Sequence, residues 1–256
     1  MRIVVKVGTS TLAHKTGNLN IRRVEELVKV LADLKNAGHE VVLVSSGAIG
    51  MGLGKLSMKE RPSDLPTKQA CASVGQCELM YTYDKLFSEY NHTVAQILIT
   101  GSDLRDPERH GNFQNTLYKL LELGAIPVIN ENDTIATEEI VIGDNDTLSA
   151  IVATSVEADV LVILSDIDGL YTGDPRKDKG AKLIKVVDEI TDEIMELGGG
   201  SGSKLGTGGM RTKLLAAEVA TGGNVDMVIA NGKNPDVLYD IVEDKDFVGT
   251  KFCARK

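Results

Sequence analysis

Two lysines in this sequence stand where they could bind phosphate. Lys6 ends a short apolar run just before Gly8, and Lys213 lies one turn after the pair Gly208-Gly209. Glycine lets main-chain N–H groups approach an anion closely, and a following helix N-terminus adds partial positive charge. A single lysine in either place is usually only solvated. Together, beside glycine-rich turns, the two lysines indicate a site that binds a triphosphate from two sides. Their positive charges would neutralise the negative charge on the group being transferred.

Glycine gathers at four places that follow apolar runs. It makes up 26 of 256 residues, about 10% against a usual value of about 7%. The four clusters are 6–10, 45–50, 168–175 and 198–213. One such cluster could serve only to tighten a turn. Ligands of open α/β sheets bind at the carboxyl ends of strands, so four clusters at strand ends favour a binding edge.

Two polar runs add amides and carboxylates to the same picture. Asn130-Glu131-Asn132-Asp133-Thr134 follows one apolar run, and Gly143-Asp144-Asn145-Asp146-Thr147 precedes a helical stretch. Asn145 or Asp146 alone could simply cap that helix. With the glycine clusters, the runs predict a pocket for a small substrate, with carboxylates for an amine and amide donors for a carboxylate.

Several classes of protein lack their signatures here. Neither GxxxxGK[ST] nor GxGxxG occurs, the protein-kinase HRD and DFG elements are missing, and the four histidines form no HExxH group. The net charge of 28 − 37 = −9 and the 4% aromatic content argue against a nucleic-acid binder. Three cysteines without a CxxC pair argue against a disulfide scaffold or a zinc site. With no signal peptide or membrane-length apolar run, we expect a soluble, cytoplasmic protein.

Apolar runs and helical periods alternate along the chain, which predicts an α/β fold. The expected strands are 3–7, 41–44, 94–99, 126–129, 160–164 and 227–230. The expected helices are 21–35, 67–90, 112–123, 146–156 and 210–220. We therefore expect one domain, 1–256, with an open, mainly parallel central sheet and helices on both faces. The extended stretches 138–142 and 183–187 suggest a small antiparallel β-hairpin appendage, and about the last 15 residues a tail.

Taken together, the motifs resemble the amino-acid kinase family over essentially the whole chain. The matching segments are Val5–Ser10, Ser45–Ile49, Pro127–Asp133, Val141–Asp146, Asp168–Thr172, Asp174-Pro175 and Gly206–Lys213. The most specific of these are Ile-Asn-Glu-Asn-Asp, Gly-Asp-Asn-Asp and Gly-Thr-Gly-Gly-Met. They resemble the branch of the family that uses ATP to phosphorylate the γ-carboxylate of L-glutamate, the first step of proline biosynthesis.

The resemblance implies a role for individual residues. The implied catalytic residues are Lys6, Lys213 and Asp146, with Asp146 orienting the two lysines. The implied substrate-binding residues are Ser46, Gly47, Ala48, Asn130, Asp133 and Asn145. The implied ATP-binding residues are Lys6, Gly8, Thr9, Ser165, Asp166, Thr207, Gly208, Gly209, Met210, Arg211, Thr212 and Lys213. Residues 1–150 would form the glutamate-binding lobe and 151–256 the nucleotide-binding lobe.

The resemblance also implies partners. Mg²⁺ would accompany ATP without a metal site built from protein side chains, proline would be a feedback inhibitor, and the assembly would be a homodimer or homotetramer. Neither nucleic acid nor membrane is an expected partner. Many bacterial members of this branch carry a C-terminal PUA domain, and we expect this chain to be a form without it. Two alternatives stay open: a kinase of the same family acting on aspartate, N-acetylglutamate, carbamate or UMP, and a non-catalytic nucleotide- or amino-acid-binding regulator.

Overall fold

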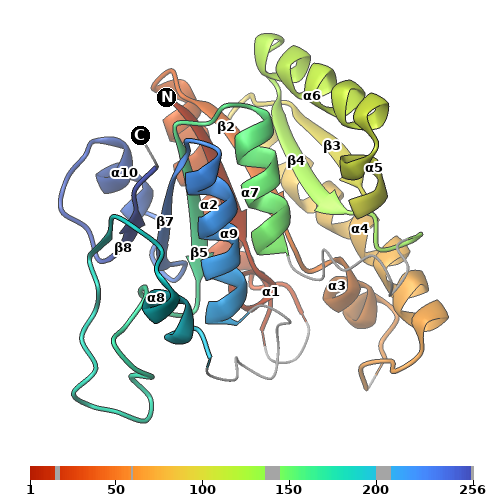
Figure 1. The fold of residues 1–256 in the computed structure, drawn as a ribbon. Coiled ribbons are helices and arrows are strands. Elements are labelled where there is room, and N and C mark those ends of the chain that lie inside the picture. Colours follow the sequence, from red (N-terminus) through yellow and green to blue (C-terminus); the bar gives the residue numbers. More distant parts are fainter. Residues whose placement is uncertain (15–17, 59, 136–144, 200–208, 255–256) are drawn as a thin grey trace.

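The computed structural model describes residues 1–14, 18–58, 60–135, 145–199 and 209–254, and these form one eight-stranded sheet with helices on both faces (Figure 1). The strand order is β3-β4-β2-β1-β5-β7-β8-β6. Neighbouring strands are parallel except for the antiparallel pair β7–β8. The strands are β1 Arg2–Val7, β2 Glu40–Ser45, β3 Val94–Ile99, β4 Ile126–Glu131, β5 Val160–Ser165, β6 Val186–Val187, β7 Asp226–Asn231 and β8 Gly249–Phe252. The predicted open, mainly parallel sheet is confirmed.

Each of the six predicted strands lies within a strand of the structure. The reason is visible in their burial: β5 is buried at every position and β1 at every position after Arg2. A strand covered by helices on both faces needs apolar side chains at successive positions, not at alternate ones. The continuous apolar runs therefore identified the strands correctly.

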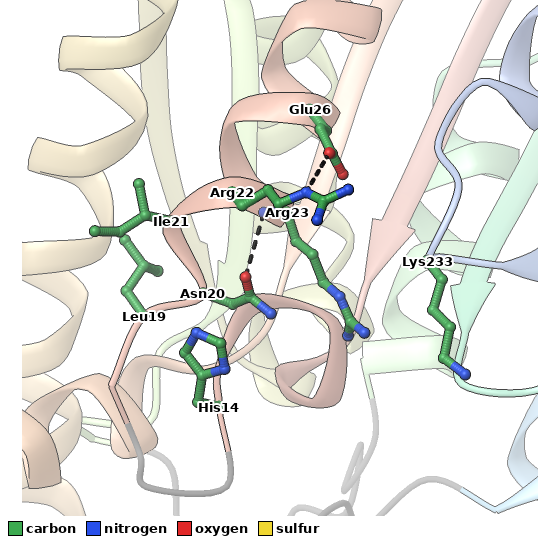
Figure 2. A pocket seen from close by; sticks show the side chains of 8 residues that line it. All are labelled: His14, Leu19, Asn20, Ile21, Arg22, Arg23, Glu26 and Lys233. Carbon is green, nitrogen blue, oxygen red and sulfur yellow. Dashed lines mark hydrogen bonds and ion pairs between the residues drawn. The ribbon is translucent and has the colours of Figure 1, made fainter.

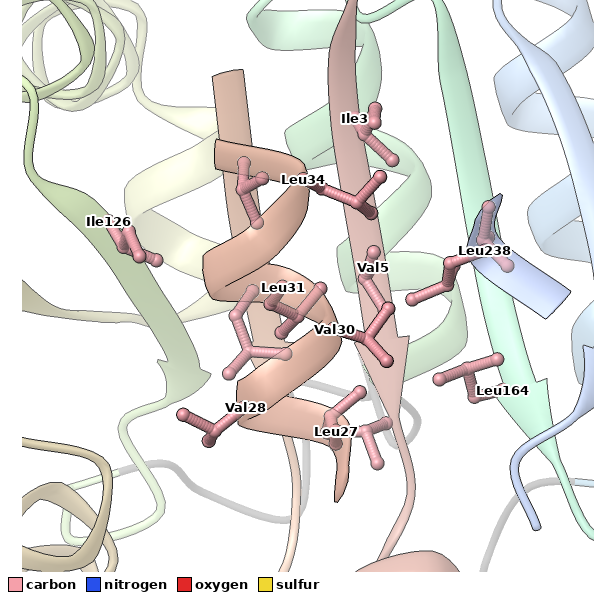
Figure 3. Close-up of a cluster of buried hydrophobic side chains, with 14 of the residues drawn as sticks. Ile3, Val5, Leu27, Val28, Val30, Leu31, Leu34, Ile126, Leu164 and Leu238 are labelled. Atoms are coloured by element: carbon pink, nitrogen blue, oxygen red, sulfur yellow. The ribbon is translucent and has the colours of Figure 1, made fainter. Parts of the chain in front are cut away.

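Helices cover the sheet in two groups, each over its own hydrophobic core. The helices are α1 Thr9–Leu12, α2 Ile21–Asn36, α3 Ala48–Lys55, α4 Leu65–Ser88, α5 Gly101–Arg105, α6 Pro107–Glu122, α7 Asn145–Ser155, α8 Asp192–Glu196, α9 Met210–Gly222 and α10 Val237–Val242. On one face, α2, α4 and α10 pack against side chains such as Val5, where Figure 3 shows Leu27 and Leu31 of α2. On the other face, α6, α7 and α9 pack against side chains such as Val4.

Two glycines bring α3 and α4 into backbone contact. A Cβ atom on Gly52 of α3 would lie 1.8 Å from the main-chain oxygen of Cys71 on α4. A Cβ atom on Gly75 of α4 would lie 1.7 Å from the main-chain oxygen of Ala48 on α3. Any side chain at either position would force the helices apart. The helix α3 was not predicted, because a stretch with three glycines has a low intrinsic helix propensity.

The expected tail is wrong, since Gly249–Phe252 form β8 and pair with β7 inside the sheet. Within the predicted antiparallel stretch 183–187, the antiparallel contact is a single bridge between Leu183 and Tyr171. Val186 and Val187 instead form β6, which runs parallel to β8. The other half of the expected hairpin, 138–142, lies outside the described residues. Of the helices that the structure describes, none is both long and apolar enough to cross a membrane.

Candidate functional site

Three buried charged residues meet at the carboxyl end of β1. Lys6 Nζ lies 2.5 Å from Oδ1 of Asp146, and Lys213 Nζ lies 3.0 Å from Oδ2 of the same carboxylate. Both lysines are 6% exposed and Asp146 is fully buried. Burying charges costs free energy unless each is paired, so such a cluster is a weak source of stability. With two cations and one anion, it carries a net positive charge that favours a further anion.

The fold explains why these residues converge. Lys6 lies one residue before the end of β1. Its side chain is on the same face of the sheet as that of Val4, and α7 and α9 cover this face. Figure 1 shows these two helices side by side. Asp146 lies in the first turn of α7, and Lys213 in the first turn of α9. The structure therefore brings the three predicted catalytic residues together.

Thr212 ties the start of α9 to the same carboxylate. Its hydroxyl lies 3.1 Å from Oδ2 of Asp146 and 2.7 Å from the main-chain oxygen of Gly209, the residue that precedes α9. The N–H groups in the first turn of a helix have no partner within that helix, and they carry partial positive charge. The first turn of α9, which carries Lys213, is therefore held beside Asp146 and Lys6.

The turns after β1 and β2 lie against each other at this edge. A Cβ atom on Gly8 would lie 3.6 Å from Lys6 Nζ, and one on Gly47 would lie 3.8 Å from the hydroxyl of Thr9. Gly47 has a φ of +106°, a left-handed conformation that glycine adopts at little cost. It precedes α3, so Ala48 is the first residue of that helix. The predicted residues Gly8, Thr9, Gly47 and Ala48 therefore border one region.

Amide side chains form a hydrogen-bonded group beside the charged cluster. The Nδ2 atom of Asn145 lies within hydrogen-bond distance of three acceptors: the hydroxyl of Ser46 at 2.7 Å, Oδ1 of Asn130 at 2.9 Å and the carbonyl of Ser45 at 3.1 Å. Asn145 precedes Asp146 in α7, whereas Ser46 follows β2 and Asn130 lies within β4. Three of the predicted substrate-binding residues are thus in direct contact.

Two carboxyl groups stand at the end of β4. Partial burial and the nearby Asp133 carboxylate raise the pKa of Glu131 to about 7. Burial also raises the pKa of Asp133, the remaining predicted substrate-binding residue. Desolvation penalises a carboxylate that has no cation beside it, and a bound ammonium group would reverse that effect. This corner is therefore suited to a positively charged ligand group.

The residues at positions 165 and 166 that are predicted to bind ATP lie next to β1, on the side of the sheet formed by β5 and β7. Ser165 is the last residue of β5 and is buried, whereas Asp166 is exposed. Across the sheet, Ser165 is the register partner of Asn231 in β7. The side-chain amide of Asn231 donates a hydrogen bond to Asp168 at 2.7 Å. Thr207 and Gly208 lie outside the described residues. Gly209 and Met210 are half-buried at the start of α9, and Arg211 is exposed.

A hollow of about 490 Å³ lies on the α2 side of the sheet and contains none of the predicted site residues (Figure 2). Arg22, Arg23 and Lys233 line it with three cations beside one carboxylate, that of Glu26. Figure 2 shows Arg22 paired with Glu26, and the Asn20 side chain accepting a hydrogen bond from the main-chain N–H of Arg23. Because the charged cluster is on the other face of the sheet, this hollow is a separate feature.

Sequence reasoning did not find the side chains that support the site from α4. Gln76 accepts a hydrogen bond from Asn130 at 2.9 Å, and the Tyr83 hydroxyl lies 2.9 Å from that of Ser45. Burial raises the pKa of the Tyr83 phenol. Both residues lie on the face of α4 that also buries Leu79 and Phe87. The available signal was a glutamine on an otherwise apolar helix face, which is unusual in a buried position.

Comparisons with known proteins identify close relatives. The model of the amino acid kinase family matches residues 1–231. The chain is 54% identical to the glutamate 5-kinase of Clostridium perfringens (strain 13 / Type A), covering all of this chain and 96% of that one. It is also 54% identical to the glutamate 5-kinase of Caldanaerobacter subterraneus subsp. tengcongensis, covering all of this chain and 68% of that one.

Two solved structures share the fold. A UMP kinase from Ureaplasma parvum superposes with a TM-score of 0.65 at 16% identity, and the match covers 98% of both chains. An isopentenyl phosphate kinase in complex with its substrate superposes with a TM-score of 0.67 at 19% identity, covering 98% of this chain and 99% of that one. At these identities the likeness concerns the fold alone.

Proposed function

The chain belongs to the amino acid kinase family, and we propose that it transfers the γ-phosphoryl group of ATP to the γ-carboxylate of L-glutamate. The product is L-glutamyl 5-phosphate, and the reaction is the first step of proline biosynthesis. The observation that carries the proposal is the buried pairing of Lys6 and Lys213 with Asp146, next to the amide group around Asn145. The two relatives named glutamate 5-kinase support the choice of acceptor.

The proposed reaction needs charge neutralisation more than proton transfer. A carboxylate carries no proton at neutral pH, so its oxygen attacks the γ-phosphorus directly, the bond to the bridging oxygen of ADP breaks, and no general base is required. The obstacle is repulsion between two anions, several kcal/mol for unit charges about 4 Å apart at an effective dielectric constant of about 20. Lys6 and Lys213 offset that repulsion and stabilise the charge on the transferring group.

The order of the strands supports a division of the chain into two halves. The strands of residues 1–150 occupy the side β3-β4-β2-β1, and those of 151–256 the side β5-β7-β8-β6. In the proposal, the first half binds glutamate through Ser46, Asn145 and Asp133, with Gly47, Ala48 and Asn130 beside them. The second half binds ATP through Ser165, Asp166 and residues 207–213, with Gly8 and Thr9 completing the phosphate site beside Lys6.

Mg²⁺ fits this site as a companion of the nucleotide. Both oxygens of Asp146 face lysine ammonium groups, so this carboxylate is engaged by cations already on the protein. Among the described residues, no group of three or more His, Cys, Asp or Glu is placed to hold a metal ion. Mg²⁺ bound to ATP keeps several waters and is coordinated through phosphate oxygens. When bound, it neutralises phosphate charge; Lys6 and Lys213 would face the remaining oxygens.

The proposal extends to partners and location. We expect a cytoplasmic homodimer or homotetramer that proline inhibits, because these properties accompany the glutamate-phosphorylating branch that the motifs resemble. Size-exclusion chromatography with light scattering measures the assembly. Activity at increasing proline concentration measures the inhibition.

A coupled assay of ADP release tests the function. With L-glutamate, ATP and Mg²⁺ we expect turnover that saturates with glutamate. The matched reactions contain aspartate, N-acetylglutamate, carbamate or UMP in its place, and we expect little ADP release from them. Faster turnover with one of these acceptors would reassign the substrate. Binding of ATP with no glutamate-dependent ADP release would instead favour a regulator.

A further inference from the structure

Gln76 connects the helix α4 to the group of amides at the site. It is 8% exposed and lies on the buried face of the helix. Its Oε1 atom accepts a hydrogen bond from Asn130 Nδ2 at 2.9 Å. Its Nε2 atom donates to Oε1 of Gln96, an exposed residue of the edge strand β3, at 3.3 Å. Gln76 therefore spans the distance from the edge of the sheet to a predicted substrate-binding residue.

The main chain fixes the orientation of the neighbouring amides. Oδ1 of Asn130 accepts from the main-chain N–H of Glu131 at 2.9 Å, and that group can only donate. Asn145 Nδ2 donates to the carbonyl of Ser45, which can only accept. Asn130 consequently turns its oxygen toward Asn145 and its Nδ2 toward Gln76. An acceptor at position 76 satisfies that Nδ2 atom, which belongs to a side chain only 2% exposed.

We propose that Gln76 is a positioning residue for the glutamate site: it holds the Asn130 amide in the orientation that keeps Asn145 directed at Ser46. The proposal rests on the proposed function, in which Asn145 and Ser46 contact glutamate. Without an acceptor at 76, the Asn130 amide gains a partner for Nδ2 only by rotating. Rotation takes its oxygen away from Asn145, so the contact between Asn145 and Ser46 loosens. Gln76 itself does not touch the reacting atoms.

A second polar contact from the same helix supports this inference. Tyr83 lies two turns after Gln76, and its hydroxyl is 2.9 Å from that of Ser45. The Ser45 carbonyl is one of the acceptors of Asn145. The close approach of α4 to α3 at Gly75 lies beside Gln76 in the sequence. The position of α4 relative to the amides is therefore fixed at more than one point.

Steady-state kinetics of Gln76→Leu and Gln76→Glu test the proposal. For Gln76→Leu we expect KM for glutamate to rise about tenfold, which corresponds to about 1.4 kcal/mol. KM for ATP and kcat should stay within about twofold, since Gln76 does not contact Lys6 or Lys213. Gln76→Glu should restore most of the glutamate affinity, because a carboxyl oxygen still accepts from Asn130 and the exposed Gln96 can rotate its amide to donate.

The control variant is Gln114→Leu. Gln114 is a half-buried glutamine of α6 that donates to the carbonyl of Ser155 at 3.0 Å, away from the amides. Its loss should leave KM for glutamate unchanged, whatever it does to the melting temperature. An unchanged KM for glutamate in folded Gln76→Leu would overturn the proposal. So would a joint change of both KM values and kcat that Gln76→Glu fails to correct, because that pattern indicates a merely structural role.

Two further measurements keep the test decisive. If Gln76→Leu does not fold, Gln76→Met, which has a side chain of similar length and no acceptor oxygen, replaces it with the same expectations. If the unaltered protein shows no glutamate-dependent ADP release, the proposed function fails. In that case calorimetric titration of L-glutamate into the unaltered protein and Gln76→Leu decides the positioning role separately. Equal affinities, or no binding to either protein, would overturn it.

Discussion

Lys6 and Lys213 bind opposite oxygens of one buried carboxylate, that of Asp146. One lysine comes from the central strand β1 and the other from α9, so the carboxylate fixes the distance between two cations that belong to different halves of the chain. A phosphoryl group arriving between the lysines would therefore meet preorganised positive charge.

Replacing Lys213 should separate catalysis from stability. Lys213→Ala removes one of two cations and leaves Lys6 and Asp146 as a neutral pair. We expect kcat to fall by a factor of about 100 to 1,000, as when one group that stabilises a transition state is removed, and the free energy of unfolding to change little. Kinetics and urea denaturation measure the two quantities. Lys29→Ala, at an exposed position of α2, is the control, and near-normal turnover of Lys213→Ala would contradict the proposed mechanism.

Removing the negative charge of Asp146 should lower the free energy of unfolding more than removing the positive charge of Lys213. Asp146→Asn leaves two buried ammonium groups facing a neutral amide. We expect the free energy of unfolding to fall by about 3–5 kcal/mol, the usual effect of breaking a buried ion pair from one side. Because bound polyphosphate would neutralise the lysines, ATP should raise the melting temperature of Asp146→Asn. A variant as stable as the unaltered protein would show that the carboxylate does not hold the lysines.

The stability of the protein should depend on pH through Glu131. Its pKa is about 7 in the folded protein, above the ordinary value of 4.5, so between these values the folded state holds a proton that the unfolded state has released. The stability associated with this group is therefore fully present below about pH 4.5 and is lost as pH rises toward 7. Glu131→Gln cannot lose a proton, so its advantage over the unaltered protein should grow across this range.

Urea denaturation at several pH values between 4.5 and 7 measures this difference. Asp133, whose pKa burial also raises, contributes in the same direction in both proteins. Glu25→Gln, on the exposed face of α2, controls for the removal of one negative charge in general. A constant difference between Glu131→Gln and the unaltered protein at all pH values would contradict the assignment of this slope to Glu131.

One methyl group added between α3 and α4 should disturb the proposed glutamate site. In Gly75→Ala the new Cβ atom would lie 1.7 Å from the main-chain oxygen of Ala48, so α3 and α4 must separate. We expect a loss of about 1–3 kcal/mol in the free energy of unfolding and a higher KM for glutamate. In Gly111→Ala, within α6, nothing lies within 4 Å of the new atom. That control should be about 0.5–1 kcal/mol more stable; equal effects of the two changes would contradict the close contact.

The strands and the two phosphate-binding lysines could be predicted from sequence because each depends on local pattern, whereas the pairing of both lysines with Asp146 was implied by the family resemblance. Apolar runs reflect burial on both faces of a strand, and Lys6 and Asp146 stand at the ends of elements whose order could be inferred. Where the carboxyl ends of parallel strands share an edge, side chains at those ends meet. The same reasoning placed Asn130 and Asn145 near each other.

The remaining features depend on contacts between elements that no local pattern reports. The glycines of α3 lower helix propensity, yet Gly52 is required by the approach of α4 at Cys71. Gln76 resembles any polar residue of a long helix until its partner Asn130, from a distant strand, is known. Residues 245–254 contain too short an apolar stretch to indicate β8, which gains its stability by pairing with β7.

In the proposed reaction, the position of β1 in the sheet sets where the two substrates would meet. Strand order runs outward from β1 through β2 and β4 on one side and through β5 and β7 on the other, which places β1 at a topological switch point, where open α/β sheets bind their ligands. Lys6 is paired with Val44 of β2 and Ile163 of β5, each about 4.8 Å away across the ladder. In the proposed reaction, the sheet would therefore set the distance between the phosphoryl donor and the acceptor. Changes in the surrounding loops would then alter affinity, while the main-chain hydrogen bonds of the sheet would preserve the alignment of the two substrates.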